Sequence, residues 1–330
     1  MEALELRVIA GAEVRELLAY PDCVRVVAGA MRAVSDGRAL LPLRQSMAVP
    51  GVEGRLAWMP GCLGEPACFG IKLLSLYPGN PAVGLSSHVG LYVLYELTHG
   101  RPLAVLEASA LTAIRTAAAS VVATQALARR DAHTLAIVGT GEEARTHLEA
   151  FQAVRPFERV IIWGRDAAKA EALAVRARAL GAARVEVASS VREAAAAADV
   201  LCTVTSAPTP LLQGGDLRPG MHLCLVGSSI PQTREVDDEV VARARFFVDY
   251  RASAMAQAGE LLHAIRAGRV TEAHVLGEIG EVLAGRVVGR RSDDDITLYK
   301  SLGVAAQDLA AATLVHQRAQ ERRAGTVARL

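Results

Sequence analysis

Three basic residues stand among apolar neighbours, where a charge needs a partner. They are Arg44, which follows Pro42-Leu43, Lys72 in a run of Gly, Ile and Leu, and Arg115 within Thr112-Ala113-Ile114-Arg115-Thr116. An unpaired buried charge is costly. For any one of these residues, an internal ion pair or a side chain that reaches solvent is the simpler interpretation. Together they predict a small anion site, which a carboxylate substrate would fit.

A second group of candidates surrounds a glycine turn. Residues 134–138 read as a buried strand, and an apolar helical pattern begins directly after the turn. Gly139 permits a tight turn, and Gly141 lets the backbone approach a pyrophosphate, which the free N–H groups of a helix start can bind. A single pattern of this kind also occurs in ordinary turns, but strand, turn and helix in this order favour a dinucleotide site. The residues expected to contact the cofactor here are Gly139, Thr140, Gly141 and Glu142.

The strand expected at residues 159–163 ends in Gly164-Arg165. In a Rossmann unit, an acidic residue near this point binds the ribose 2′-hydroxyl of NAD, whereas an arginine accommodates the 2′-phosphate of NADP. No carboxylate stands at the strand end, and Asp166 comes one place later. We therefore expect NADPH, with Gly164 and Arg165 at its 2′-phosphate. NADH is the alternative, because Arg165 can also be a solvated surface residue.

Strands and helices alternate through the middle of the chain. Further strands are expected at residues 184–187, 199–205, 221–226 and 245–249, and helices at 167–180, 191–198 and 254–267. This alternation is typical of a doubly wound parallel sheet. Ligands of such sheets bind beyond the carboxyl ends of the strands. Thr205-Ser206 and residues 227–229 should therefore line the same crevice as the glycine turn.

The N-terminal part has a different pattern. Residues 6–37 read as helical, and short apolar segments follow, separated by Pro and Gly turns. These segments, 43–49, 54–59, 69–76 and 89–95, predict a largely antiparallel sheet outside the dinucleotide fold. An alanine-rich helix at 116–128 should lead into that fold. A last helix is expected at 305–318, and the charged tail 320–330 is expected to fray.

Composition limits the partners. The 330 residues can hold two domains, and a net charge of +1, from 36 basic and 35 acidic residues, gives no general field for nucleic acid or an anionic membrane. The five cysteines show no CxxC or Cys/His spacing, so neither disulfides nor a metal site is expected. Neither a secretion signal nor an apolar run of membrane-spanning length is present in the sequence, which favours a soluble, cytoplasmic protein.

Several separated motifs are together similar to one family. They are LTAIRTAA at 111–118, GTG at 139–141, ADV at 198–200, VGSS at 226–229, REVD at 234–237 and ITLYKSLG at 296–303. In this order and spacing they resemble the ornithine cyclodeaminase/mu-crystallin family over nearly the whole chain. The resemblance implies an α/β fold, with a Rossmann domain at 117–304 and a second α+β domain, built from 1–116 and 305–330, for substrate binding and dimerisation. It also implies a homodimer joined through that second domain.

The resemblance implies roles for single residues. The family's contacts to the substrate carboxylate match Arg44, Lys72 and Arg115, with Met59 beside them, which agrees with the argument from buried charge. Ser87 and His88 match a loop pair that reaches toward the cofactor, although a lone loop histidine is ordinarily a structural residue. The further cofactor neighbours implied are Thr205, Ser206, Val226 and Ser301.

One departure from the family decides the expected chemistry. The cyclodeaminases carry an aspartate in the loop after the Val-Gly strand, suited to handling the amine and activating water, and Ser229 stands in its place. A serine hydroxyl is a poor general base in that role. The family's ketimine reductases also lack the aspartate. Segments 228–231 and 248–251 are similar to those of bacterial Δ1-pyrroline-2-carboxylate reductases.

The resulting hypothesis is NADPH-dependent reduction of a cyclic ketimine, Δ1-pyrroline-2-carboxylate to L-proline or Δ1-piperideine-2-carboxylate to L-pipecolate. The three cations would hold the substrate carboxylate, and a proton would come from water or through Ser229 and Lys72. One alternative is an ornithine or lysine cyclodeaminase, which releases ammonia and holds NAD tightly. The others are an alanine or N-alkyl amino acid dehydrogenase, and a nonenzymatic protein that binds a small molecule.

Overall fold

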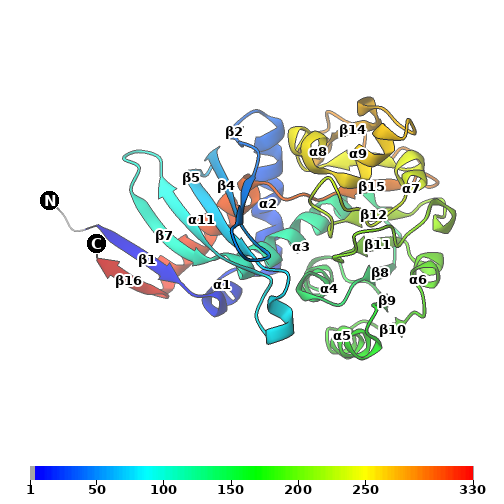
Figure 1. Ribbon diagram of the computed structural model, residues 1–330, viewed down its shortest axis with the longest axis horizontal. Helices are drawn as coiled ribbons and strands as arrows, with labels where there is room; N and C mark the ends of the chain where they lie inside the picture. Colours follow the sequence, from blue (N-terminus) through cyan, green and yellow to red (C-terminus); the bar gives the residue numbers. More distant parts are fainter. Residues whose placement is uncertain (1–3, 330) are drawn as a thin grey trace. The chain divides into compact units, whose positions relative to one another are not determined.

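The computed structural model describes residues 4–329, which form two compact units, each with its own sheet (Figure 1). Unit 1 is made of Met1–Arg115 and Val304–Leu330, and unit 2 is Thr116–Gly303. Substrate binding and dimerisation by the first unit, and dinucleotide binding by the second, remain predictions.

Unit 2 contains an eight-stranded sheet in which all neighbouring pairs among the described strands are parallel. Its strands are β8 (Thr134–Val138), β9 (Arg159–Trp163), β10 (Arg184–Val187), β11 (Val200–Thr203), β12 (His222–Leu225), β13 (Arg245–Val248), β14 (Val275–Glu278) and β15 (Thr297–Lys300). The order across the sheet is β10-β9-β8-β11-β12-β15-β13-β14. From β8 the chain adds β9 and β10 on one side and then returns to add β11 and β12 on the other, so the strand order reverses between β8 and β11. Every residue of β8 is buried, as expected for a parallel strand covered on both faces. The predicted doubly wound sheet is confirmed.

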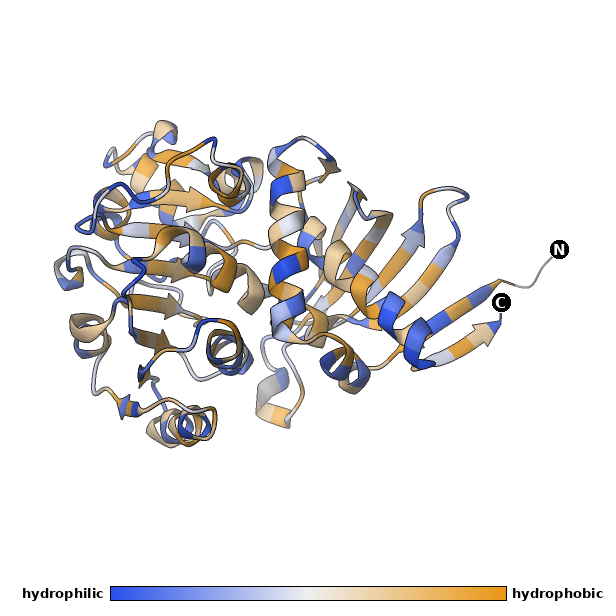
Figure 2. Ribbon diagram, turned by 180° about the vertical axis from the view of Figure 1, so that it is seen from behind, coloured by the Kyte–Doolittle hydropathy of each residue, from blue (hydrophilic) through white to orange (hydrophobic). Residues whose placement is uncertain are grey.

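Helices connect these strands and cover the sheet. They are α4 (Glu142–Val154), α5 (Ala167–Ala179), α6 (Val191–Ala197), α7 (Asp238–Arg243), α8 (Arg251–Gln257), α9 (Gly259–Arg266) and α10 (Ile279–Leu283), with 3-10 turns η2 (Gly214–Asp216) and η3 (Glu272–His274). The single helix expected at 254–267 is wrong, because α8 ends and α9 begins at Ala258. A Cβ on Gly259 would lie 1.9 Å from Thr233 O, so only glycine fits at this bend. In Figure 2 the strands of this unit are mainly hydrophobic, whereas its helices carry hydrophilic stretches.

Unit 1 contains the second sheet, which is largely antiparallel as predicted. Its strands are β1 (Glu5–Ile9), β2 (Ala39–Leu40), β3 (Gln45–Val49), β4 (Gly54–Gly64), β5 (Ala67–Leu76), β6 (His88–Glu96), β7 (Pro102–Glu107) and β16 (Thr326–Arg329). The order is β16-β1-β7-β6-β5-β4-β2, with β3 also beside β4. Among the described strands of this sheet, β1 and β7 form the one parallel pair.

Four helical segments belong to unit 1, and a fifth runs on into unit 2. They are α1 (Gly11–Leu17), α2 (Tyr20–Ser35), η1 (Asn80–Val83), α11 (Ala305–Arg322) and, across the boundary, α3 (Ala108–Leu127). The C-terminal α11 packs on α2, β4 and β5, and so covers part of a sheet made from N-terminal residues. Within residues 4–329, α3 is the one helix long and apolar enough to span a membrane by length and composition, but 83% of its apolar window is buried inside the protein.

Two expectations near the chain ends are wrong. Residues 5–9 form β1 instead of the start of a helix, because their backbone pairs with β7 on one side and β16 on the other. Up to Arg329 the tail does not fray, because α11 continues to Arg322 and β16 follows and pairs with β1, while Leu330 lies outside the described residues. As an edge strand, β16 can carry charged residues such as Arg329 that reach solvent.

Candidate active site

The glycine turn lies at the carboxyl end of β8, where the strand order reverses. Gly139 has a φ of 131°, and a Cβ there would lie 2.7 Å from Val204 O, so the turn requires glycine. Gly141 is the N-cap residue of α4, which receives no hydrogen bond from a capping side chain. Apart from its own neighbours along the chain, none of residues 4–329 lies within 4 Å of a Cβ built on Gly141, so there is room for a ligand to approach the backbone there. This geometry fits a dinucleotide pyrophosphate.

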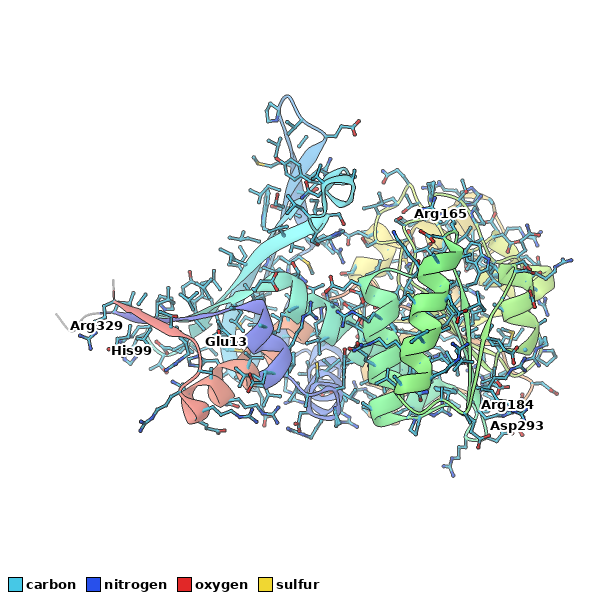
Figure 3. All side chains as sticks on the ribbon, turned by 90° about the horizontal axis from the view of Figure 1, so that it is seen from below. Glu13, His99, Arg165, Arg184, Asp293 and Arg329 are labelled. Carbon is cyan, nitrogen blue, oxygen red and sulfur yellow. The ribbon has the colours of Figure 1, made fainter. Side chains whose placement is uncertain are left out.

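The end of β9 offers a cation and no available carboxylate. A Cβ on Gly164 would lie 2.4 Å from Thr140 Cγ2, so this residue must stay small for the two turns to approach each other. Asp166 accepts a hydrogen bond of 3.1 Å from Lys169 N and thereby caps α5. Arg165 is exposed, and Figure 3 shows it at the opposite end of unit 2 from Arg184, the first residue of β10.

The ends of three neighbouring strands meet beside this turn. Thr205-Ser206 follows β11, Val226 follows β12 and Ser301 follows β15. Val226 N donates to Thr203 O at 3.0 Å, and Ser301 N donates to Leu225 O at 2.9 Å, so the last hydrogen bonds of the sheet hold these ends together. The structure therefore gathers the predicted cofactor neighbours of unit 2 at one edge of the sheet. Their contact with a cofactor remains a prediction.

Two buried carboxylates that the sequence did not single out fix the loops at this edge. Asp249 accepts hydrogen bonds from Leu302 N at 2.9 Å and Gly303 N at 2.6 Å, just after Ser301. Glu235 accepts from the ends of both β11 and β12. Burial raises the pKa of Glu235, and this effect outweighs the opposing effects of Lys300 and of its hydrogen bonds. An acidic residue directly after a buried strand is the signal that could have identified Asp249, whereas Glu235 lies outside the strands, between β12 and α7.

Two of the three predicted substrate cations share an internal carboxylate in unit 1. Lys72, from β5, lies with its Nζ 2.8 Å from Asp308 Oδ2, and Arg115 Nε, from α3, donates to Asp308 Oδ1 at 2.8 Å. Asp308 belongs to the first turn of α11, where the helix dipole also favours a negative charge. Lys72 and Arg115 are only 1% and 4% exposed, and Asp308 is fully buried. The sequence did not identify Asp308, although an acid in an alanine-rich helix needs a partner when buried.

The charges in this group alter one another. Burial, followed by the nearby Arg115, lowers the pKa of Lys72 to about 8, while Asp308 opposes this fall and Arg44 adds to it. Burial alone would raise the pKa of Asp308, but Arg115 and Lys72 hold it below its ordinary value. Arg44 is therefore close enough to act on Lys72. Met59, 8% exposed, is the register partner of Lys72 on β4, so the structure brings the four predicted substrate residues together.

Polar atoms without a protein partner lie in the same interior. Gln307 Oε1 accepts from Arg115 Nη1 at 3.1 Å, but Gln307 Nε2 is buried and has no hydrogen-bond partner among the described residues. The hydroxyl of Tyr92 is buried and, within the same residues, also has none. Asp308 acts on the pKa of Tyr92, which burial raises well above its ordinary value. Donors of this kind fit a polar ligand, because buried polar groups are normally satisfied.

The remaining predicted residues lie in separate places. Ser87 Oγ lies 2.9 Å from His88 Nδ1 in unit 1, where an exposed loop enters β6 and His88 is the first residue of the strand. Ser229 is half-buried in unit 2, so its approach to Lys72 or to a cofactor is a prediction, as is that of the Ser87-His88 pair. Residues 4–329 contain no group of three or more His, Cys, Asp or Glu side chains that could hold a metal ion.

The sequence and the fold both match known proteins. The model of the ornithine cyclodeaminase/mu-crystallin family matches residues 5–323. The Δ1-pyrroline-2-carboxylate reductase of Bacillus cereus strain ATCC 10987 / NRS 248 is 34% identical over 319 residues, which cover 96% of this chain and 98% of that protein. The ketimine reductase mu-crystallin of Mus musculus is 35% identical over 281 residues, which cover 85% of this chain and 86% of that protein. The Δ1-pyrroline-2-carboxylate reductase of Thermococcus litoralis, solved with NADH and L-proline, superimposes with a TM-score of 0.93 at 32% identity and covers 97% and 99%.

Proposed function

Because the chain belongs to the ornithine cyclodeaminase/mu-crystallin family, we propose that it is an NADPH-dependent reductase of cyclic ketimines. The substrates are Δ1-pyrroline-2-carboxylate, reduced to L-proline, and Δ1-piperideine-2-carboxylate, reduced to L-pipecolate. The observation that carries the proposal is the buried group of Lys72, Arg115 and Asp308, in a chain whose second unit has a glycine turn fit for a dinucleotide. Reduction of a C=N bond with a nicotinamide cofactor is the activity that the relatives' names support.

The substrate carboxylate is held by charge. Lys72 and Arg115 share the single internal carboxylate of Asp308, so two cations face one anion, and Arg44 adds to the fall in the pKa of Lys72. A monoanionic imino acid therefore meets a net attraction inside a poorly solvated site, where electrostatic interactions are stronger than in water. Gln307 Nε2 adds a neutral donor. Asp308 keeps the two buried cations apart and orients them before the substrate arrives.

The protein's own residues orient the imine and handle its proton. When bound, NADPH supplies the hydride for the imine carbon. The cation group fixes the carboxylate next to that carbon, which removes much of the entropic part of the barrier. Lys72, with its pKa near 8, is mostly protonated at neutral pH and can release a proton readily, as an efficient general acid requires. Ser229 is the second candidate for passing a proton to the imine nitrogen.

The preference for NADPH rests on the end of β9. Gly164 lets Thr140 of the neighbouring turn approach, Arg165 supplies a positive charge, and Asp166 is engaged in capping α5. A 2′-phosphate would find a cation where NAD-specific sites present a carboxylate. The Thermococcus litoralis enzyme was solved with NADH, so NADH is the second cofactor to be tested.

The partner of this soluble, cytoplasmic enzyme is a second copy of the chain. The sheet face of unit 1 opposite α11 exposes apolar side chains, and those of Met47, Leu56, Val89 and Leu91 are 51%, 37%, 49% and 51% exposed. The register places Met47 beside Leu56, Leu56 beside Ser75 and Ser75 beside Val89, so one row crosses four strands. A contiguous apolar surface of this kind is typical of an interaction site. This face supports a homodimer joined through unit 1.

Steady-state oxidation of NADPH and NADH with the five-membered and six-membered imines tests the function. We expect turnover with both imines, a higher kcat/KM with NADPH, and loss of turnover in Lys72→Met. Two further arms test the rivals. Ammonia released from ornithine without added cofactor would show a cyclodeaminase instead. Better turnover with pyruvate and an amine would show an amino acid dehydrogenase, and no NADPH consumption with any imine would refute the proposal.

A further inference from the structure

Glu235 is a fully buried acid within the REVD motif, at residues 234–237, that the proposed reaction does not use. It lies in unit 2, in the segment between β12 and α7. Its position matters because β11 and β12 end beside it, and these are the strands whose following loops contain Thr205, Ser206, Val226 and Ser229.

The Glu235 carboxylate joins the two strand ends where the sheet itself stops. The last backbone hydrogen bond between β11 and β12 runs from Val226 N to Thr203 O. Beyond it, Thr205 N and Thr205 Oγ1 both donate to Glu235 Oε1 at 2.8 Å. Thr203 Oγ1 and Gly227 N donate to Oε2, each at 2.7 Å. The Glu235 side chain thus links the two segments beyond the point where backbone hydrogen bonds between β11 and β12 end.

The fit around this carboxylate is tight. A Cβ on Gly227 would lie 2.0 Å from Thr205 O and 2.4 Å from Glu235 Oε1, so the loop after β12 can close on Thr205 only because residue 227 is glycine. Both carboxylate oxygens accept two hydrogen bonds, and two of the four donors are backbone N–H groups, which cannot act as acceptors. An ionised carboxylate satisfies all four donors.

A lysine holds the same loop on its other side. Lys300 Nζ donates to Ser228 O at 2.6 Å and lies 3.1 Å from Glu260 Oε2. Glu235 N in turn donates to Glu260 Oε1 at 3.3 Å. These three charged side chains are fully buried. Residues 227 and 228 are therefore fixed by their backbone atoms, which leaves the half-buried Ser229 at a defined position in the loop.

We propose that Glu235 is a positioning residue for the nicotinamide end of the bound cofactor. It sets the spacing between the Thr205-Ser206 loop and the Gly227–Ser229 loop, which follow β11 and β12 at the carboxyl ends of the strands, where ligands of such sheets bind. The inference rests on the proposed function, because it takes these strand ends as the cofactor site. Small displacements of a reacting group lower the rate steeply, so the spacing of these two loops matters for kcat.

The isosteric variant Glu235→Gln tests this role. Whichever way its amide is turned, the NH2 group faces either Thr205 N or Gly227 N, and neither of these can accept a hydrogen bond. The matched control is Asp237→Asn in the same motif. Asp237 accepts from Val240 N at 2.9 Å and Gly214 N at 3.1 Å, so the control also changes a carboxylate that binds backbone N–H groups, but at the start of α7.

A comparison of two ligands distinguishes effects at the nicotinamide end of the cofactor from effects at its adenosine end. We would measure the Kd of NADPH, and of 2′-phospho-ADP-ribose, which lacks the nicotinamide, together with kcat and the fluorescence of bound NADPH. In Glu235→Gln we expect the Kd of NADPH to rise about tenfold, the size of one charge-assisted hydrogen bond, and kcat to fall about 10-fold to 100-fold. The Kd of 2′-phospho-ADP-ribose should stay within about twofold, and Asp237→Asn should change none of these values.

Each outcome decides the proposal. Equal loss of affinity for both ligands in Glu235→Gln would overturn it, because the change would then be a general loss of structure. Unchanged NADPH affinity and kcat would overturn it as well. If Glu235→Gln does not fold, Thr203→Val removes one donor to Oε2, and an unchanged kcat in that variant would count against the role. Wild-type protein that binds NADPH but reduces no imine would refute only the proposed function. The Kd values of NADPH and 2′-phospho-ADP-ribose would still test whether Glu235 positions the nicotinamide end.

Discussion

Replacement of Asp308 by Asn should move the pH dependence of the enzyme in a defined direction. Asp308 Oδ2 lies 2.8 Å from Lys72 Nζ and is the main negative charge that opposes the effects of burial and of Arg115 on this lysine. Lys72 binds a substrate carboxylate only while it is protonated. In the wild type, kcat/KM should therefore be constant below a pH of about 8 and fall as the pH rises through this value. In Asp308→Asn the fall should begin at a lower pH.

The size of the change follows from the charge that is removed. An opposite charge at this distance shifts a pKa by about 1 to 3 units, which takes Lys72 from about 8 to between about 5 and 7 in the variant. At a pH of about 7.5, the protonated fraction of Lys72 would fall from about three-quarters to about a quarter or less. The loss in kcat/KM would be about threefold at the small end of this range and about 200-fold at the large end.

The assay is kcat/KM for the five-membered imine from about pH 5 to 10, with saturating NADPH. Comparison of variant and wild type in the same buffers cancels the titration of the substrate itself. Asp22→Asn is the matched control, because Asp22 forms an ion pair with Arg318 of α11 but lies near the surface. Lys72→Arg keeps its positive charge over this pH range, so it should remove the inflection in both backgrounds. Thermal unfolding of each variant shows whether it is folded at the assay temperature.

The competing expectation is that loss of a negative charge makes the site more attractive to an anion. If Lys72 stayed protonated in Asp308→Asn, the net charge of the group would rise by one and KM would fall. If Lys72 loses its proton, the net charge does not change. A lower KM with an inflection still near pH 8 would therefore refute the coupling between Asp308 and Lys72.

Three further changes test other parts of the structure. Arg165→Asp should raise the KM for NADPH at least about tenfold and leave that for NADH nearly unchanged, and an unchanged NADPH preference would remove this anchor. Gly164→Ala should weaken both cofactors, because its Cβ would lie 2.4 Å from Thr140 Cγ2, and cofactor Kd values measure this directly. Leu91→Glu replaces a 51% exposed apolar side chain of β6 by a charged one, so sedimentation should show a monomer in place of the dimer proposed for the wild type. An unchanged dimer would exclude that face.

The sequence was sufficient for the features that depend on local pattern. The apolar run of β8 followed by glycines predicts a buried strand that ends in a tight turn. The structure confirms this, because Gly139 has the positive φ that the turn needs. The strands and helices of unit 2 alternate along the chain, and each could be predicted from the apolar pattern of its own residues. Local pattern also showed that Lys72 and Arg115 need partners.

Pairing between distant segments could not be predicted in the same way. Asp308 is 193 positions from Arg115 along the chain, and its helix is so rich in alanine that its sequence does not show which face meets the sheet. The same limit explains β1, whose charged residues read as helical until β16 pairs with them. Glu235 appeared as part of a motif, but its role depends on two strand ends that meet only in the fold.

The division of unit 1 between the two ends of the chain has a consequence for synthesis. Unit 2 is one continuous segment, whereas unit 1 also needs Val304–Leu330, which are synthesised after unit 2. Until these residues are synthesised, Lys72 and Arg115 have no Asp308 to pair with, and the N-terminal sheet is not covered by α11. A chain stopped at residue 303 should show proteolytic protection of unit 2 and ready cleavage of unit 1. A stop codon just after the codon for residue 303 should therefore be as harmful as an early one.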